Sequence, residues 1–66
     1  MLVTINAKEY DIPKDATISD ILKMLGVEEK TMAVAVNMQI VKKDKWQEFR
    51  PKEGDKIEIL GFTGGG

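Results

Sequence analysis

Lys56-Ile57-Glu58-Ile59-Leu60 is the stretch that decides the fold of this chain. Polar and apolar residues alternate along it, as they do in a β-strand with one covered face. A hairpin with the short preceding strand Gln39-Ile40-Val41 alone would not bury that face well. We therefore expect this last strand to pair in parallel with the first strand, near the middle of a sheet. The turn signal Pro51-Lys52-Glu53-Gly54-Asp55 marks its beginning.

The start of the chain predicts a β-hairpin. Leu2-Val3-Thr4-Ile5 and Tyr10-Asp11-Ile12 are rich in strand-forming residues, and the polar stretch Asn6-Ala7-Lys8-Glu9 connects them. Pro13 is expected to end the second strand because proline cannot donate to the ladder.

A short amphipathic helix is expected next. Thr17 suits the N-cap, and Asp20 places negative charge near the positive end of the helix dipole. Gly26 suits the position just after the helix, where a left-handed conformation is common. Four apolar residues at helical spacing form the face that we expect to cover the hairpin: Ile18, Ile21, Leu22 and Leu25.

The second half of the chain predicts more strands. Met32-Ala33-Val34-Ala35-Val36 is an apolar run typical of a central strand with both faces covered or nearly so. Asn37-Met38 forms a turn, and Gln39-Ile40-Val41 forms a short return strand. Residues 42–50 form a polar loop, and its aromatic residues Trp46 and Phe49 indicate that it packs on the body.

This order predicts a two-layer α+β domain with one helix packed on one face of the sheet. We expect the domain to span residues 1–60 and a flexible glycine tail to span residues 61–66. A chain of 66 residues buries only about 60% of its unfolded surface, which leaves little room for an internal pocket.

Composition narrows the function further. The chain has no Cys and no His, which excludes disulfides, the usual zinc and iron–sulfur ligand sets, a thiol nucleophile and an imidazole base. We therefore expect no bound metal or cofactor and no independent enzyme. Ten basic and eleven acidic residues nearly cancel, so no field for nucleic-acid binding is expected. The interrupted basic stretch Lys42-Lys43-Asp44-Lys45 beside Trp46 is the only candidate for weak contact of that kind.

No apolar run is long enough for a membrane span, and the first residues lack the pattern of a signal peptide. We expect a cytoplasmic protein that does not associate with membranes.

The end of the chain holds the best candidate for chemistry. Phe62-Thr63-Gly64-Gly65-Gly66 follows the last strand, and an extended arm from Gly61 would reach roughly 20 Å. Its one distinctive group is the α-carboxylate of Gly66. Activated as a mixed anhydride with AMP, this carboxylate would give a thiocarboxylate with a sulfur nucleophile, or an isopeptide bond with a lysine. A frayed terminus without function is the alternative.

Several stretches together resemble a known family. They are Ala33-Val34-Ala35-Val36-Asn37 with Gln39-Ile40-Val41, Trp46 after the basic loop, Glu53-Gly54-Asp55-Lys56-Ile57-Glu58-Ile59, and the terminal Gly65-Gly66. In this order and at this length, the chain resembles the bacterial sulfur carriers of thiamine biosynthesis, the ThiS family. The resemblance covers nearly the whole chain and implies a ubiquitin-like β-grasp fold, with a mixed sheet of about five strands.

The resemblance also implies a mechanism. An E1-like (ThiF-like) adenylyltransferase would use ATP and Mg²⁺ to adenylate the Gly66 carboxylate. The persulfide of a sulfur donor, such as a cysteine desulfurase, would convert it to a thiocarboxylate. A ThiG-like thiazole synthase would then accept the sulfur.

The expected site residues follow from the same resemblance. Gly66 carries the sulfur, Gly65 and Gly64 let the tail enter a partner's active site, and Phe62 anchors the tail or packs at the sheet edge. Leu60 and Glu58 on the last strand complete the partner-binding set. Glu58, with Glu53 and Asp55, either meets basic groups on a partner or simply faces solvent.

The family ends in a glycine pair, whereas this chain ends in three glycines. Either Gly64 lengthens the arm, or the reactive pair is Gly64-Gly65 and Gly66 is removed first. Other functions also stay open. They are the small subunit of molybdopterin synthase, a carrier for another sulfur metabolite, an isopeptide-forming modifier, and a β-grasp binding module with an inert tail.

Overall fold

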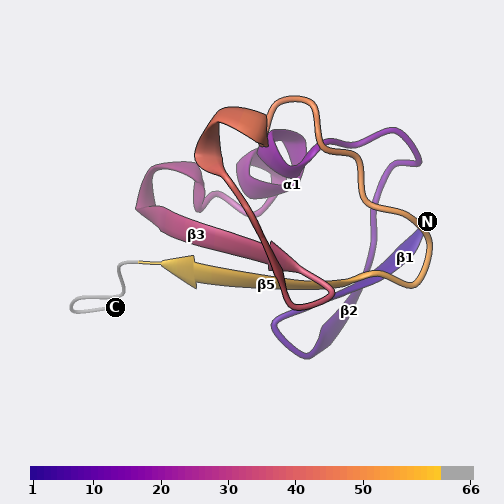
Figure 1. The fold of residues 1–66 in the computed structure, drawn as a ribbon. Helices are drawn as coiled ribbons and strands as arrows, with labels where there is room; N and C mark the ends of the chain where they lie inside the picture. Colours follow the sequence, from indigo (N-terminus) through magenta and orange to yellow (C-terminus); the bar gives the residue numbers. More distant parts are fainter. Residues whose placement is uncertain (62–66) are drawn as a thin grey trace.

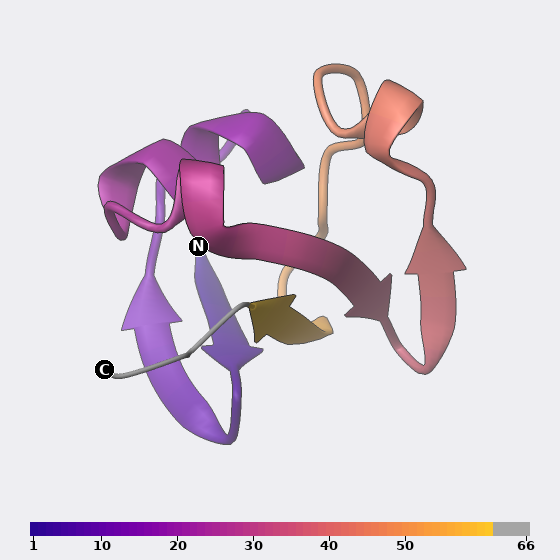
Figure 2. The ribbon, with the colours of Figure 1, turned by 90° about the vertical axis from the view of Figure 1, so that its left-hand side faces the viewer.

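The computed structural model describes residues 1–61. Within them, five strands form one mixed sheet in the order β2-β1-β5-β3-β4, and helix α1 packs against it (Figure 1). Figure 2 shows the helical segments gathered above the strands. The elements are β1 (Leu2–Ile5), β2 (Lys8–Asp11), α1 (Ile18–Met24), the 3₁₀ turn η1 (Glu28–Lys30), β3 (Thr31–Val36), β4 (Gln39–Val41), the 3₁₀ turn η2 (Lys43–Lys45) and β5 (Lys56–Gly61). The predicted α+β architecture is confirmed.

Two tight hairpins build the sheet from its edges. β1 and β2 turn at Asn6 and Ala7, with φ of 49° and 68°, while β3 and β4 turn at Asn37 and Met38, with φ of 51° and 71°. Two consecutive positive φ values are the mark of a type I′ turn, whose twist matches that of the flanking strands. The prediction for β2 was wrong at its start. The strand begins at Lys8, so half of the expected polar connection is strand.

Helix α1 begins and ends as predicted. The Thr17 hydroxyl accepts from the Asp20 backbone N–H at 3.1 Å, and the Asp20 carboxylate accepts from the Thr17 N–H at 3.0 Å. This reciprocal capping box satisfies two backbone donors at the helix start. Gly26 has φ of 70° and ends the helix. The Val27 N–H reaches the Leu22 carbonyl at 3.0 Å, which completes a Schellman motif.

The core lies between α1 and the sheet. Ile18, Ile21 and Leu22 are fully buried, as their spacing predicted, whereas Leu25 packs at the margin. The loop after β4 covers one side of this core with Trp46, whose indole Nε1 donates to the Val41 carbonyl at 2.8 Å. The same loop caps α1, because the Phe49 and Trp46 carbonyls accept from the first two helix amides. The predicted packing of this loop on the body is confirmed for Trp46, whereas the Phe49 side chain is 37% exposed.

The prediction for β3 was wrong in part. β3 is hydrogen-bonded on both sides, but the middle of the sheet is β5. Val34 and Val36 are buried under the helix, whereas Ala33 and Ala35 are half-buried on the opposite face. Met32 is 65% exposed and lies at a register shift of the strand between Thr31 and Ala33. One helix covers only one face, so the alternate residues of β3 face solvent.

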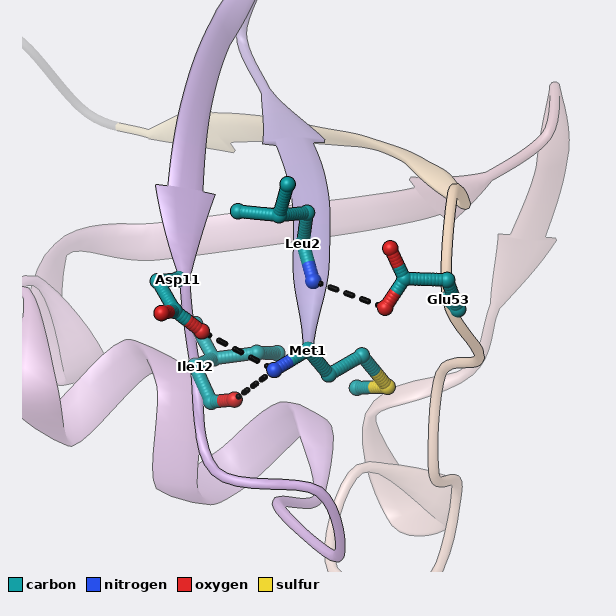
Figure 3. A network of polar contacts seen from close by, with 5 residues as sticks. All are labelled: Met1, Leu2, Asp11, Ile12 and Glu53. Carbon is teal, nitrogen blue, oxygen red and sulfur yellow. Dashed lines mark hydrogen bonds and ion pairs between the residues drawn. The ribbon is translucent and has the colours of Figure 1, made fainter.

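A polar network fastens the first strand at its beginning (Figure 3). The Met1 amino group donates to Asp11 Oδ1 at 2.9 Å and to the Ile12 carbonyl at 3.0 Å. The Leu2 N–H donates to Glu53 Oε1 at 3.0 Å. The start of β1 is therefore joined both to the end of β2 and to the turn before β5.

Among residues 1–61, no helix has the length and apolar character needed to cross a membrane.

Candidate functional site

The site is built around β5, the strand that leads into the C-terminal residues. β5 lies in the middle of the sheet, parallel to β1 and antiparallel to β3, as predicted. Its second residue, Ile57, is buried, and Ile59 packs against the margin of the core. β1 pairs with the first residues of β5, Lys56 and Ile57, whereas β3 pairs with the strand as far as Gly61.

The end of β5 passes close to η1. A Cβ atom on Gly61 would lie 3.1 Å from the Lys30 carbonyl oxygen, which is tighter than ordinary van der Waals contact. Gly61 is paired with Thr31 of β3, so the strand takes in the residue at which the sequence placed the start of the tail. Glycine at this position lets the strand pass the turn without displacing it.

Two asparagines from the hairpin turns contact the backbone of β5. Asn6 holds Ile59, since the Ile59 N–H donates to Asn6 Oδ1 at 2.8 Å and Asn6 Nδ2 donates to the Ile59 carbonyl at 3.2 Å. Asn37 holds the other end of the strand, accepting from the Lys56 N–H at 2.9 Å and donating to Asp55 Oδ1 at 3.1 Å. Sequence reasoning assigned both residues only to connections, because their partners in β5 lie 53 and 19 positions away.

The face of the sheet opposite the helix carries apolar side chains beside the end of β5. Leu60 pairs with Ala33, and Ala35 pairs with both Glu58 and Ile40. Leu60 is 66% and Ile40 69% exposed, and these residues line a shallow groove together with Asn6. We call Ala33, Ala35, Ile40 and Leu60 the open-face patch. The sequence singled out Leu60 alone, because strand order decides which residues become its neighbours.

The predicted carboxylates separate into two groups. Glu53 accepts from the Leu2 N–H, and Asp55 accepts from the Lys52 N–H at 2.8 Å, so both shape the turn before β5. Glu58 is exposed at the groove of the open-face patch. Of the three, Glu58 is therefore the carboxylate that the fold places beside the patch.

The remaining predicted site residues, Phe62, Gly64, Gly65 and Gly66, lie outside the described residues, as does the proposed tail beyond Gly61.

Charge elsewhere is distributed over the surface. No group of three or more acidic side chains within residues 1–61 is placed to hold a metal ion. The Thr17 backbone N–H, followed by its hydroxyl, holds the pKa of the Asp20 carboxyl below its ordinary value, which reflects helix capping. Trp46, the aromatic residue beside the basic stretch, is 4% exposed and gives no open ring for a base to stack on.

Comparison with known proteins agrees with this architecture. The chain is 35% identical to the sulfur carrier protein ThiS of Bacillus subtilis, over 98% of the chain and the whole of that protein. It superimposes on the crystal structure of the thiamine biosynthesis protein ThiS from Geobacter metallireducens with a TM-score of 0.81 and 27% identity, covering all of both chains. The fold is thus the ubiquitin-like β-grasp.

A longer relative matches as well. The chain is 36% identical to a thiazole synthase of Paramagnetospirillum magneticum, which it matches over its whole length while spanning only 20% of that protein. The family model matches residues 3–66, including the end of the chain. The chain belongs to the ThiS family.

Proposed function

We propose that this chain is a sulfur carrier of thiamine biosynthesis that holds sulfur as a thiocarboxylate on Gly66. The observation that carries the proposal is the position of β5. In the sequence, the terminal glycines follow the central strand of this ThiS-family domain after only two residues, which would let the body remain on a partner's surface while the terminus enters its active site.

The chemistry takes place at one carboxylate. An oxygen of the Gly66 carboxylate attacks the α-phosphate of ATP, which forms an acyl adenylate and releases pyrophosphate. The terminal sulfur of a persulfide then displaces AMP, and a thiol cleaves the resulting acyl disulfide to leave the thiocarboxylate. The adenylyltransferase binds the ATP and Mg²⁺ that this activation uses. The chain itself acts as a carrier and co-substrate, and has no Cys that would capture the activated acyl group.

Three partners are proposed. They are an E1-like adenylyltransferase, a sulfur donor such as a cysteine desulfurase, and a thiazole synthase that accepts the sulfur. The relative from Paramagnetospirillum magneticum supports the last of these, since a thiazole synthase there includes a stretch similar to this whole chain. The open-face patch and Glu58 offer an apolar centre with a carboxylate beside it, which suits a partner surface with apolar and basic groups.

Intact-mass spectrometry tests the proposal. After incubation with the adenylyltransferase, ATP, Mg²⁺ and bisulfide, we expect a mass gain equal to the replacement of one oxygen by sulfur. Bisulfide displaces AMP directly, so the experiment needs no persulfide donor. The matched control lacks Gly65 and Gly66 and should gain no mass. An unchanged mass for the full chain, with an enzyme shown to be active on another ThiS carrier, would refute the proposal.

The acceptor is tested separately. The thiocarboxylate form should support thiazole formation by thiazole synthase and should not support molybdopterin formation by the large subunit of molybdopterin synthase. The reverse result would assign the chain to molybdopterin synthesis with the same tail chemistry.

A variant that lacks Gly66 distinguishes the two glycine pairs, because it should react faster than the full chain only if Gly64-Gly65 is the functional end.

A further inference from the structure

We propose that Asn6 is a positioning residue for the reactive terminus. Its side chain continues the series of hydrogen bonds between β1 and β5 toward the C-terminal end of β5. The role in sulfur transfer rests on the proposed function, whereas the effect on β5 does not. Asn6 lies in a turn at the opposite end of the sequence from Gly66, and contacts the strand that precedes the tail.

The hydrogen bonds form a regular series. Backbone N–H groups of β1 and of the turn residue that follows it donate to every second carbonyl from Asp55, just before β5, onward: Thr4 donates to Asp55 and Asn6 to Ile57, both at 3.0 Å. After Asn6 the backbone of β1 turns away into the hairpin. The next carbonyl in the series is that of Ile59, and Asn6 Nδ2 donates to it in place of a backbone amide.

The contact works in both directions. Asn6 Oδ1 also accepts from the Ile59 N–H at 2.8 Å, so one primary amide satisfies both polar groups of a strand residue. Beyond Ile59, the described pairing of β5 is with β3 alone, at Leu60 and Gly61. Asn6 is therefore the last contact from the β1 side along the part of β5 that the structure describes. η1 restricts the other side, where Gly61 approaches Lys30.

Asparagine suits this position for two reasons. Its φ of 49° lies in the left-handed region, which asparagine tolerates better than most residues. Its side chain carries both a donor and an acceptor in one plane, as a peptide group does. An aspartate at this position would keep the acceptor for the Ile59 N–H and lose the donor for the Ile59 carbonyl.

The second hairpin provides a matched control. Asn37 has φ of 51°, lies at the same position of a type I′ turn, and accepts from a backbone N–H of β5 at nearly the same distance. Its partner is Lys56, at the end of β5 remote from the tail. Replacing either asparagine by glycine keeps the turn conformation accessible and removes the hydrogen bonds of its side chain, two with Ile59 for Asn6 and one with Lys56 for Asn37.

Hydrogen exchange measured by NMR on the intact chain tests the contact itself. In Asn6→Gly the Ile59 amide should exchange about five- to tenfold faster, which corresponds to the loss of one hydrogen bond. The Lys56 amide should change no more than the core amides. Asn37→Gly should show the reverse pattern. Equal acceleration of both amides in both variants would overturn the proposal, because it would indicate only a general loss of stability.

Kinetics test the positioning role. With pyrophosphate release as the readout and the carrier as varied substrate, Asn6→Gly should lower kcat about tenfold, as expected for a misplaced reacting group. Its KM should stay close to that of the wild type, because the open-face patch is intact. Asn6→Asp should lie between the wild type and Asn6→Gly. Asn37→Gly should leave both constants unchanged, at a temperature where every variant is folded.

The outcomes separate the two proposals. An unchanged kcat in Asn6→Gly, together with faster exchange at Ile59, would show that the contact exists and does not position the terminus. A wild-type chain that releases no pyrophosphate would overturn the sulfur-carrier function and the positioning role within it. The exchange pattern would still decide whether Asn6 holds the end of β5.

Discussion

At the scale of single residues, the second hairpin turn, at Asn37-Met38, was predicted correctly from the sequence, whereas the first was not placed exactly. Type I′ turns favour Asn-Gly, but here the pairs are Asn6-Ala7 and Asn37-Met38. Without the glycine, the Asn6 turn gave no precise register, and β2 was expected too late in the chain. The asparagines persist at positive φ because each side chain also bonds to β5, a contact visible only once the sheet is assembled.

Ala7→Gly should stabilise the domain. Ala7 has φ of 68°, and a left-handed conformation costs an L-residue about 1–2 kcal/mol. Glycine avoids this cost, but part of the gain is cancelled because glycine loses more conformational entropy on folding. We expect a net gain of about 0.5 kcal/mol in the free energy of unfolding, measured by urea titration. Ala35→Gly makes the same chemical change within β3 and should destabilise the protein. A loss of stability in Ala7→Gly would contradict this account of the turn.

Trp46→Phe tests a buried hydrogen bond. The predicted packing role of Trp46 is confirmed, and its indole also donates to the Val41 carbonyl. Phenylalanine would fill most of the space and leave that carbonyl without its partner, which costs about 1–3 kcal/mol. Urea unfolding followed by circular dichroism should show a loss of that size in the free energy of unfolding, with a lower midpoint. An unchanged midpoint would mean that water replaces the indole at no cost.

At the scale of elements, the sequence predicted an element well where its deciding contacts join residues that are close in the sequence. Helix α1 was predictable because Thr17, Asp20 and Gly26 act within a few residues of one another. β3 was predicted less well. A run of five apolar residues does not show which face is covered, and the answer depends on where the single helix lies. The same limit applies to the open-face patch, whose members come from three strands.

Asp20→Asn should change how stability depends on pH. The folded pKa of Asp20 is lowered by its bond to the Thr17 N–H, so its charge stabilises α1 above the ordinary pKa of 3.8. That contribution is lost as the pH falls through the lowered folded pKa. The stability difference between wild type and Asp20→Asn should therefore be constant from about pH 5 to 7 and shrink below about pH 4. Urea midpoints across this range measure it, and a constant difference down to acid unfolding would exclude the charge as its cause.

At the scale of the whole molecule, the sheet has two faces with different tasks. One buries its valines and isoleucines under α1, and the other leaves the open-face patch and Glu58 beside the end of β5. The central, parallel placement of β5 was predictable from its alternation and from the short strand before it. The tail and its chemistry still rest on family membership, since Phe62 and the terminal glycines lie outside the described residues.

Leu60→Ser tests whether the open face binds the adenylyltransferase. Leu60 is 66% exposed, so its replacement should change the free energy of unfolding by less than about 0.5 kcal/mol. If partner binding buries this side chain, the lost apolar contact of about 1–2 kcal/mol should raise KM about tenfold. The value of kcat should stay unchanged, because the reacting terminus and its support at Asn6 are intact. This pattern is the opposite of that expected for Asn6→Gly.

Met24→Ser is the matched control for Leu60→Ser. Met24 is 56% exposed and lies on α1, which covers the other face of the sheet. Loss of a comparable apolar side chain there should leave KM and kcat as in the wild type. If Met24→Ser raised KM while Leu60→Ser did not, the partner would bind the helix side of the domain. That result would move the proposed partner surface from the open-face patch to α1, on the other face of the sheet.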